Sequence, residues 1–411
     1  MRKRLTVILL AAVVFIAVAL WFLSWFPGHS YQSSVPSDVA ELAKGKPEDF
    51  EESSKEVRED LRILFVGDTS FGENYIRKSF IEYRGYDYFL EKVAPLSRGS
   101  DMVIANLETP LTDLDKSPLS WKKRYIHWGD VDKAPATLKN HNVRFVSLAN
   151  NHTMDYGVEG LTQTMLALQK SGIAWFGAGL DGSQAAKPLR SSFMIGKHPF
   201  NLVVASGFDY EILYSSVYHF YANEDHGGVN RWERKDAVQQ ISRIRQSESD
   251  AFIVAFPHWE CNYRFKTGEQ MRLAHALIEA GSDLVIGHGA HMLQEIEYYR
   301  SKWILYGLGN FVFNSPGRYQ KEGVDPFSLA ASLDVVDKAE RLTLTLRLYP
   351  IFSDNRITKY QPRLVTKEEL NRVKSTLLMR SPDPEHLQRE LMVGEDEFGL
   401  FLALDVDYQG L

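Results

Sequence analysis

Short apolar runs alternate with helical patterns along most of this 411-residue chain. The runs are rich in β-branched and aromatic residues, whereas the segments between them carry apolar residues at the spacing of one helix face. Leu161, Met165 and Leu168, for example, share one face of a helix predicted over 160–170. The alternation is typical of a layered α/β domain with a mixed or parallel sheet. The runs predict strands at 61–67, 101–106, 143–149, 200–206, 250–256 and 282–287.

The pattern changes after Phe327, where apolar and polar residues alternate one by one. Such alternation predicts antiparallel strands with one solvated face. We find no internal repeat, and we assign 61–350 to the main domain and 351–411 to a C-terminal extension packed on it. The elements predicted in this half are strands at 303–306, 311–313, 329–336, 341–352 and 398–404 and a helix at 367–378.

The amino terminus carries a long apolar run. Met1–Arg4 contains three basic residues, and Leu5–Phe26 contains no charge. An uncharged run of this length can cross a bilayer as one helix, and the basic residues before it favour a cytoplasmic amino terminus. A cleaved signal peptide is the alternative, but its apolar region is usually about 7–15 residues long and ends in small residues. We therefore expect a single-pass signal anchor over 1–28 in the cell membrane, with the main domain outside the cytoplasm.

Composition narrows the functions that fit the exported part. Residues 29–60 are polar and rich in acidic side chains, which predicts a tether between the anchor and the domain. Without the three basic residues of the amino terminus, 44 Lys and Arg stand against 53 Asp and Glu. This balance argues against nucleic acid as a partner. The single cysteine, Cys261, allows no internal disulfide, so the domain depends on its hydrophobic core.

Polar clusters directly follow five of the apolar runs. In one of them Val146–Ala149 leads into Asn150, Asn151 and His152. Ligands of open α/β sheets bind beyond the carboxyl ends of the strands, where loops present polar groups on a rigid base. The alternative is an Asx turn, with Asn150 or Asp155 capping the following helix. Equivalent positions in the other four clusters are occupied by Asp68, Asn106, Glu108, His258, His288 and His291.

Together these clusters bring carboxylates, carboxamides and imidazoles to one rim of one sheet. A mixed oxygen and nitrogen set suits Zn, Mn or Fe rather than a thiolate site. Two such ions about 3.5–4 Å apart can turn a water molecule into a nucleophile for phosphoryl or acyl centres. His152 could then protonate a leaving group, and Asp155 is grouped with it as the second candidate catalytic residue.

These residues resemble the motifs of the CapA/PgsA family of capsule and poly-γ-glutamate synthesis proteins. In chain order the motifs are Gly67-Asp68, Asn106-Leu107-Glu108, Ala149-Asn150-Asn151-His152 with Asp155-Tyr156-Gly157, His258-Trp259, 287–294 and 306–313. The resemblance implies a fold related to calcineurin-like metallophosphoesterases, a four-layer α/β/β/α sandwich that holds one or two divalent metal ions on its strand-end loops. The candidate metal ligands are then Asp68, Asn106, Glu108, Asn151, His258, His288 and His291.

Three motifs depart from the usual pattern. Ser70 stands where the phosphoesterases have a histidine, two residues after the first aspartate. The segment from His258 to Tyr263 lacks the glutamate that CapA proteins carry before the tyrosine, and Glu260 is the candidate replacement. In 287–291 the first imidazole, His288, comes one place earlier than in the common Gly-x-His-Pro-His. His288 therefore either reaches the site from there or is a turn residue.

Other polar and aromatic residues carry weaker signals. His275 lies in a helical pattern and is expected to be structural, and His127 has no matching polar cluster, so neither is a candidate. The run Lys122–Arg124 is a candidate basic patch for an anionic polymer, because the exported part as a whole is acidic. The tyrosines and tryptophan between residues 210 and 232 are expected in the core rather than in a polymer groove.

These expectations combine into a membrane-anchored, extracytoplasmic CapA-like protein. It would act in the synthesis, export or attachment of an anionic surface polymer such as poly-γ-glutamate, beside membrane-embedded capsule synthase subunits. Its metal site would hydrolyse or transfer a phosphate ester or an amide. Two alternatives stay open: a scaffold that has lost catalysis and binds polymer or synthase subunits, and a general secreted phosphodiesterase unrelated to capsule.

Overall fold

The computed structural model describes residues 57–72, 81–338 and 341–408. The features below belong to the unit Pro47–Leu411. The predicted signal anchor over 1–28 and the predicted tether up to residue 56 lie outside the described residues. Within the part that is described, no helix is both long enough and apolar enough to span a bilayer.

The larger main sheet has ten strands and is mixed. β2 is parallel to β3 and antiparallel to β16. Two short strands, β15 (Asn310–Phe313) and β18 (Arg363–Leu364), pair with β2 and β17 respectively. The other strands in sheet order are β19 (Met392–Asp396), β20 (Gly399–Val406), β17 (Leu342–Phe352), β16 (Phe327–Asp337), β2 (Asp60–Ser70), β3 (Met102–Leu107), β4 (Phe145–Ser147) and β5 (Ala174–Phe176).

The second main sheet has eight strands. β8 is parallel to β11 and antiparallel to β7, so this sheet is mixed as well. In sheet order its strands are β1 (Val57–Arg58), β7 (Leu189–Ile195), β8 (His198–Asp209), β11 (Phe252–His258), β12 (Leu284–Ile286), β14 (Lys302–Leu305) and β13 (Ile296–Tyr299), with β10 (Arg231–Trp232) paired to β8. A separate pair is formed by β6 (Ala178–Gly179) and β9 (Gly228–Val229).

The two main sheets pack face to face around one apolar core. Ile104 and Val254, from β3 and β11, belong to the same buried cluster. The rings of Phe65 on β2 and Phe256 on β11 lie 6.0 Å apart and are fully buried. Because a strand that is covered on both faces exposes no side chain to water, its sequence reads as a continuous apolar run.

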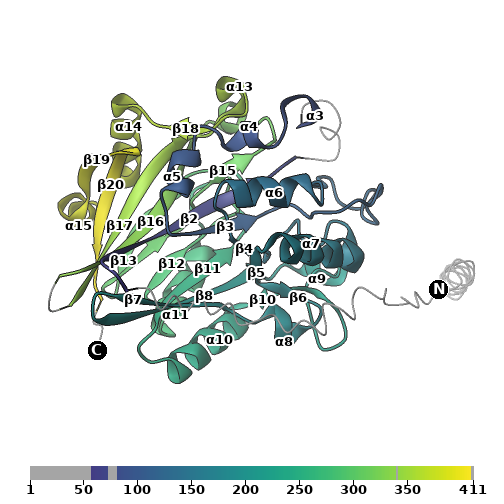
Figure 1. Ribbon diagram of the computed structural model, residues 1–411, viewed down its shortest axis with the longest axis horizontal. Coiled ribbons are helices and arrows are strands. Elements are labelled where there is room, and N and C mark those ends of the chain that lie inside the picture. The colour runs from purple at the N-terminus through teal and green to yellow at the C-terminus, as the bar shows by residue number, and fades with distance from the viewer. Residues whose placement is uncertain (1–56, 73–80, 339–340, 409–411) are drawn as a thin grey trace, which may run out of the picture. The chain divides into compact units, whose positions relative to one another are not determined.

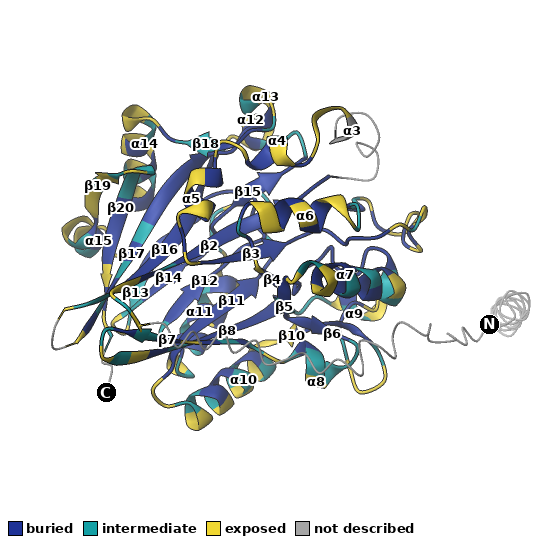
Figure 2. Ribbon diagram, in the orientation of Figure 1, coloured by how far each residue is buried: buried dark blue, intermediate teal, exposed yellow. Residues whose placement is uncertain are grey.

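Helices cover the outer faces of the two sheets. α10 (Arg234–Ser247) and α11 (Gly268–Glu279) pack through Ile241 and Leu277 against the eight-stranded sheet. α7 (Gly157–Ser171) contacts β5 of the other sheet and lies beside α6 (Lys133–Asn140). Figure 1 shows α6 and α7 on the opposite side of the strands from α10, and Figure 2 shows buried strands between helices with exposed outer faces. The described residues thus form a helix, sheet, sheet and helix arrangement, which fits the predicted sandwich.

The remaining helices are short except one. α14 (Lys367–Arg380) begins with a capping box, in which Thr366 and Glu369 exchange side-chain to backbone hydrogen bonds. It packs with α15 (Pro384–Glu390) on β20. The others are α3 (Ile81–Arg84), α4 (Asp87–Leu90), α5 (Ala94–Arg98), α8 (Gly182–Ala185), α9 (Ile212–Ser216), α12 (Tyr319–Glu322) and α13 (Asn355–Thr358).

The predicted domain boundaries fall inside pairing strands. Val57–Arg58, within the predicted tether 29–60, pair with β7. The boundary at residue 350 lies within β17, and β20 pairs with β17. Residues 399–406 are therefore part of the larger sheet. The antiparallel character predicted for the chain after Phe327 is confirmed by the pairing of β16 with β17.

Candidate metal centre

A bulge near the end of β2 aims Asp68 at the rim of the sandwich. The pairing of β2 with β3 shifts register between Val66 and Asp68, and bulges of this kind re-aim side chains next to functional sites. Gly67 lies within the bulge, where a Cβ would stand 2.0 Å from the carbonyl oxygen of Gly309. The N–H of Asp68 donates to that same oxygen at 2.9 Å. Only glycine at position 67 permits this hydrogen bond.

The buried carboxylate of Asp68 is surrounded by donors. Asn106 Nδ2 donates to Oδ1 at 3.0 Å, and the N–H of Gly289 lies 3.1 Å from the same oxygen. His291 Nδ1 lies 3.1 Å from Oδ2. Burial raises the pKa of Asp68, but the contact with His291 and the hydrogen bond from Asn106 outweigh it and bring the pKa below its ordinary value. Asp68 is therefore an ionised ligand candidate.

His258 and His288 face each other across the ends of β11 and β12. They form an isolated parallel bridge, and their Nδ1 atoms lie 3.0 Å apart. Burial holds the pKa of His258 well below its ordinary value and lowers that of His288 to about 3, so both imidazoles are neutral, the form that ligates metals. Neither buried Nε2 has a hydrogen-bond partner among the described residues. His288 thus lies within the cluster, which is the interpretation in which it reaches the site from its earlier position.

Glu108 lies at the centre of the cluster without a donor of its own. It is fully buried, and neither of its carboxylate oxygens accepts a hydrogen bond from the residues that the structure describes. His152 Nε2 and His291 Nε2 each stand 3.9 Å from its Oε1. Burial and the negative charge of Asp68 raise the pKa of Glu108 well above its ordinary value. A buried carboxylate in this position requires either a proton or a cation.

Three sets of side chains could each hold a cation, and they overlap. The ligand atoms in each set lie within 4.8 Å of one another. Two sets share Asp68 and two share Glu108, so the sets are adjacent. Their mixture of carboxylate oxygen and imidazole nitrogen fits one or two ions of the Zn, Mn or Fe class. The sets are Asp68 with His258 and His288, Asp68 with Glu108 and His291, and Glu108 with His127 and His152.

The two predicted carboxamide ligands differ in their surroundings. Asn106 uses both ends of its amide, because its Oδ1 accepts from Asn150 Nδ2 at 3.1 Å while its Nδ2 donates to Asp68. Asn151 donates through Nδ2 to Glu260 Oε1. Its buried Oδ1 accepts no hydrogen bond within the described part of the chain. Asn151 Oδ1 is therefore available to a metal, whereas Asn106 holds Asp68 in position.

The Asx turn that was the alternative at this loop is present beside the cluster. Asn150 Oδ1 accepts the N–H groups of His152 and Thr153, both at 3.1 Å. Asp155 does not cap α7, whose N-cap is Tyr156 without a side-chain hydrogen bond. The turn and the cluster are thus compatible, because Asn150 shapes the loop while its neighbours Asn151 and His152 face the other polar groups.

The two candidate catalytic residues form a hydrogen-bonded pair with a buried lysine. His152 Nδ1 lies 2.7 Å from Asp155 Oδ2, and Lys123 Nζ lies 2.5 Å from Asp155 Oδ1. Lys123 is only 8% exposed, so the prediction of a surface patch formed with Lys122 and Arg124 is wrong for this residue. Burial and the charge of Lys123 hold the pKa of His152 well below its ordinary value. The imidazole is therefore neutral.

Two members of the cluster were not recognised in the sequence. His127 Nδ1 lies 2.8 Å from the carbonyl oxygen of Glu108, and Lys123 contacts both Asp155 and the carbonyl oxygen of Asn151. Both come from the segment between β3 and α6. No apolar run precedes either residue, so the strand-end signal could not find them. A lysine and a histidine four residues apart in a polar segment read as solvent-exposed.

Glu260 lies next to the cluster, whereas His275 does not belong to it. Glu260 lies beside the cluster, where it accepts from Asn151 and, at 3.3 Å, from the hydroxyl of Tyr214. Burial and the charge of Glu211 raise its pKa to about 7. His275 lies on α11 and bonds Glu297 at 3.0 Å. Trp232, Tyr214 and Tyr221 are buried, as expected for core aromatics, whereas Tyr210 and Tyr218 are only half-buried.

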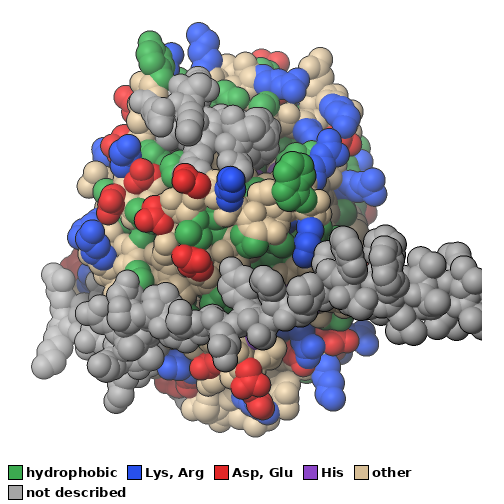
Figure 3. All heavy atoms as spheres, turned by 90° about the vertical axis from the view of Figure 1, so that its right-hand side faces the viewer, with side chains coloured by type: hydrophobic (Ala, Val, Ile, Leu, Met, Phe, Trp, Pro, Cys, Tyr) green, Lys and Arg blue, Asp and Glu red, His purple; other side chains and the backbone are tan. Residues whose placement is uncertain are grey.

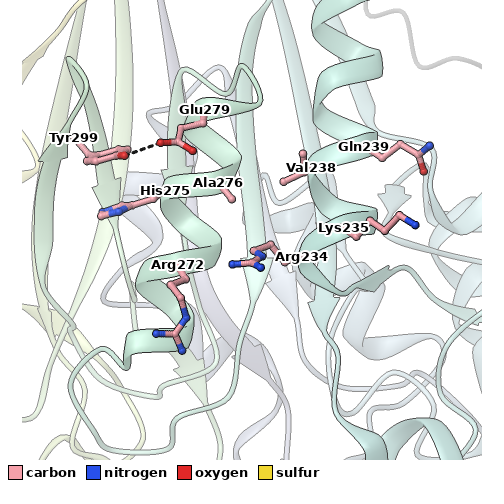
Figure 4. A pocket seen from close by; sticks show the side chains of 9 residues that line it. All are labelled: Arg234, Lys235, Val238, Gln239, Arg272, His275, Ala276, Glu279 and Tyr299. Atoms are coloured by element: carbon pink, nitrogen blue, oxygen red, sulfur yellow. Dashed lines mark hydrogen bonds between the residues drawn. The ribbon is translucent and has the colours of Figure 1, made fainter.

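A groove of about 680 Å³ lies elsewhere, between α10 and α11. Figure 4 shows side chains from both helices around it, with the hydroxyl of Tyr299 hydrogen bonded to Glu279 at 2.8 Å. Its lining includes Arg234, Lys235 and Arg272 but none of the cluster residues. The cluster, rather than this groove, is the candidate site, because only the cluster combines burial with unsatisfied ligand atoms.

The surface on the α7 side carries mixed charge. In Figure 3, acidic, basic and apolar side chains are interspersed on the part of this face that is not grey. Trp121, close in sequence to the buried Lys123, is fully exposed. A continuous basic surface for a polyanion is not visible there. Lys123, which pairs with Asp155, is the basic side chain that the structure places beside the cluster.

Asp209, at the end of β8, is expected to make stability fall as pH rises. Burial and the charge of Glu211 raise its pKa from 3.8 to about 7. The folded protein therefore holds this proton more tightly than the unfolded chain, and stability is lost between about pH 4 and 7. Asp209→Asn should be more stable relative to wild type at pH 8 than at pH 5, as measured by thermal unfolding. An equal difference at both pH values contradicts this assignment.

Comparison with known proteins identifies the family. The pattern of the family described as bacterial capsule synthesis protein PGA_cap matches residues 62–315, which cover all the strand-end motifs. The PGA biosynthesis protein CapA of Bacillus subtilis is 32% identical over 259 residues, 62% of this chain and 63% of that protein. The capsule biosynthesis protein CapA of Bacillus anthracis is 28% identical over 259 residues, 62% and 60% of the two chains.

A third relative comes from Mycobacterium tuberculosis and bears the name probable polyglutamine synthesis accessory protein. It is 31% identical over 265 residues, 61% of this chain and 66% of its own. The chain therefore spans less than two thirds of the length of each of these relatives. The resemblance drawn from the sequence motifs is confirmed, and since the family pattern covers more than half of the chain, the protein belongs to the bacterial capsule synthesis protein PGA_cap family.

Proposed function

We propose that the cluster around Glu108 binds one or two divalent metal ions, Mn, Zn or Fe, and that the protein is a metal-dependent hydrolase of capsule polymer synthesis. The observation that carries the proposal is the carboxylate of Glu108, which is fully buried with neither oxygen hydrogen bonded within the described residues. Five buried imidazoles and the carboxylate of Asp68 lie in the same three overlapping sets as Glu108. One or two cations held by these sets would give the buried carboxylate of Glu108 the partner that it lacks.

The side chains divide into ligands and proton carriers. A metal bound here would supply Lewis acidity toward a phosphoryl or acyl centre. His152, which faces Glu108 through Nε2 and Asp155 through Nδ1, would accept a proton at Nε2 from the attacking water and then pass it to the leaving group. Asp155 fixes the tautomer, since a carboxylate must receive a proton from Nδ1. Lys123 forms an ion pair with Asp155 and would attract an anionic substrate toward the cluster.

We extend the proposal to the biological role. The relatives are named for PGA biosynthesis, capsule biosynthesis and polyglutamine synthesis, and this supports an accessory role in making a poly-γ-glutamate type of anionic polymer. The uncharged run Leu5–Phe26 supports a single-pass anchor in the cell membrane with the PGA_cap domain outside the cytoplasm. The expected partners are the polymer and the membrane-embedded subunits of its synthase.

Metal content tests the proposal directly. The full-length chain, purified in detergent, should carry one to two equivalents of Mn, Zn or Fe by mass spectrometry. The double variant Asp68→Ala, His258→Ala should lose at least one equivalent, because both ligand sets that contain Asp68 lose it and one of them also loses His258. A matched control is His275→Ala, Glu297→Ala, which removes an acid and imidazole pair 3.0 Å apart outside the cluster and should keep the metal.

Activity decides between an enzyme and a scaffold. If metal binds, the loaded protein should hydrolyse either bis(p-nitrophenyl) phosphate or a γ-glutamyl anilide, and the variant His152→Asn should lose on the order of 100-fold or more in rate. Wild type with no transition metal after reconstitution contradicts the metal site. Bound metal without turnover of either compound class would favour the scaffold.

A further inference from the structure

We propose that His127 supplies the imidazole of a second metal position on the Glu108 side of the cluster and leaves His152 free as the proton carrier. The inference rests on the proposed metal site and names one of its ligands. Glu108, His127 and His152 form one of the three sets whose ligand atoms lie within 4.8 Å of one another. All three residues are buried, with His127 2% exposed. Nothing in the sequence motifs points to His127.

The hydrogen bond that His127 makes determines which nitrogen can ligate. Its Nδ1 lies 2.8 Å from the carbonyl oxygen of Glu108. A carbonyl oxygen only accepts, so Nδ1 carries the proton and the lone pair of the neutral ring is on Nε2. Metal-binding histidines usually donate their other ring N–H to a carbonyl or carboxylate in this way, which fixes the ring. His127 therefore has the tautomer of a ligand before any metal binds.

The backbone around His127 is held at both sides. The N–H of His127 donates to Asp155 Oδ2 at 2.7 Å. The N–H of Trp128 donates to the carbonyl oxygen of Gly72 at 3.0 Å, and that of Gly129 to Pro110 at 2.9 Å. A ligand fixed by its own backbone and by a ring hydrogen bond loses little freedom on binding. The segment thus carries the imidazole into the cluster on a rigid support.

Ser70 marks the space that His127 fills. Its side chain stands two residues after Asp68, and Oγ lies 3.2 Å from His127 Nδ1. A hydroxyl at position 70 leaves room for a ring that arrives from another segment. β2 thus carries no imidazole at position 70, and His127, 57 positions further along the chain, places one beside Ser70 instead.

Ring geometry separates the roles of the two histidines. His127 and His152 stack with centroids 3.4 Å apart and planes within 3° of parallel. The lone pair of a neutral imidazole lies in the plane of its ring, so two parallel rings cannot both point at one ion. His152 bonds the carboxylate of Asp155 at 2.7 Å, whereas His127 is fixed by hydrogen bonds of its ring and its backbone. The fixed ring of His127 therefore suits the ligand, and His152 is left as the proton carrier.

Two substitutions that mimic different halves of the ring test the assignment. In His127→Asn the amide nitrogen replaces Nδ1 and can still donate to Glu108, but nothing replaces Nε2. In His127→Gln the amide oxygen reaches the place of Nε2 and can ligate. After reconstitution of the full-length protein with Mn²⁺ alone, wild type should hold two equivalents, His127→Asn one, and His127→Gln two with the second bound on the order of 10- to 100-fold more weakly.

The readouts are Mn²⁺ content and the spin-coupled paramagnetic resonance signal of a two-ion site, which His127→Asn should lack. His141→Phe serves as the control, because His141 is buried and bonds Asp87 at 2.9 Å away from the cluster; it should keep both ions. Two equivalents in His127→Asn, or the loss of an ion in His127→Gln alone, overturn the ligand role. A wild type with one ion overturns this inference only, whereas a wild type with none overturns the metal site itself.

Discussion

Glu108→Gln is expected to remove bound metal and, at the same time, to make the metal-free protein more stable. Glutamine keeps the shape of the side chain but carries no charge, so the fully buried group no longer needs a proton or a cation. At pH 7 the metal-free wild type must keep a proton on this carboxyl that the unfolded chain releases, because burial raises the pKa of Glu108. Glutamine removes this cost, so the free energy of unfolding should rise by about 1–3 kcal/mol. The wild type should instead gain about 4 kcal/mol when free metal reaches roughly 1,000 times its Kd.

Thermal unfolding of both proteins tests this. Glu108→Gln should be the more stable protein with a chelator, and the wild type should be the more stable one with Mn²⁺. Glu297→Gln is the matched control. Glu297 is also buried, but its carboxylate accepts from the hydroxyl of Tyr306 at 2.6 Å and bonds His275 at 3.0 Å. Its substitution should lower stability in both conditions and leave the metal-induced shift unchanged. If chelated Glu108→Gln is less stable than chelated wild type, the carboxylate of Glu108 has a partner that the cluster geometry does not reveal.

The strands of the two sheets could be predicted from sequence because most are buried on both faces. The predicted run 61–67 lies within β2, and 101–106 overlaps β3. Pairing could not be predicted in the same way. β16 neighbours β2 in the sheet although about 260 residues separate them in the chain, and no local pattern specifies such a partner. β7 was not among the predicted strands, because its sequence alternates buried and less buried residues and is more polar than the apolar runs.

The site residues also differ in whether a local sequence pattern could locate them. Asp68, Glu108, His258 and His291 follow apolar runs, so strand periodicity locates them at the rim. Their ligand roles stay predictions, but the structure brings them together. His127 and Lys123 reach the same place through a long segment whose path depends on tertiary hydrogen bonds such as that from Trp128 to Gly72. Those contacts cannot be predicted from the local sequence.

The departure of residues 287–291 from the family motif has a steric basis at Gly289. Its φ is +102°, and a Cβ would stand 2.9 Å from Nε2 and 3.0 Å from Cε1 of His258. Its N–H also donates to Asp68. The loop therefore brings its backbone against the His258 ring, and the neighbouring His288 provides the imidazole. A side chain at position 289 has no space without moving a candidate ligand.

Gly289→Ala should therefore reduce metal affinity on the order of 10- to 100-fold, since it displaces His258 and weakens the support of Asp68. Gly289→His, which restores the order of imidazoles common in the family, should be at least as harmful. Titration of the chelated protein with Mn²⁺, followed by its unfolding temperature, measures the loss. The backbone strain alone should cost about 1–2 kcal/mol of stability.

Gly172→Ala separates that strain from the collision with His258. Gly172 has a φ of +69° at the end of α7, and a Cβ added there would meet no atom within 4 Å, so alanine takes a positive-φ backbone penalty there without a collision. It should lose about 1–2 kcal/mol of stability and keep its full metal affinity. If Gly289→His instead binds Mn²⁺ as tightly as wild type, His258 can yield its place, and the cluster tolerates an imidazole from either neighbouring position.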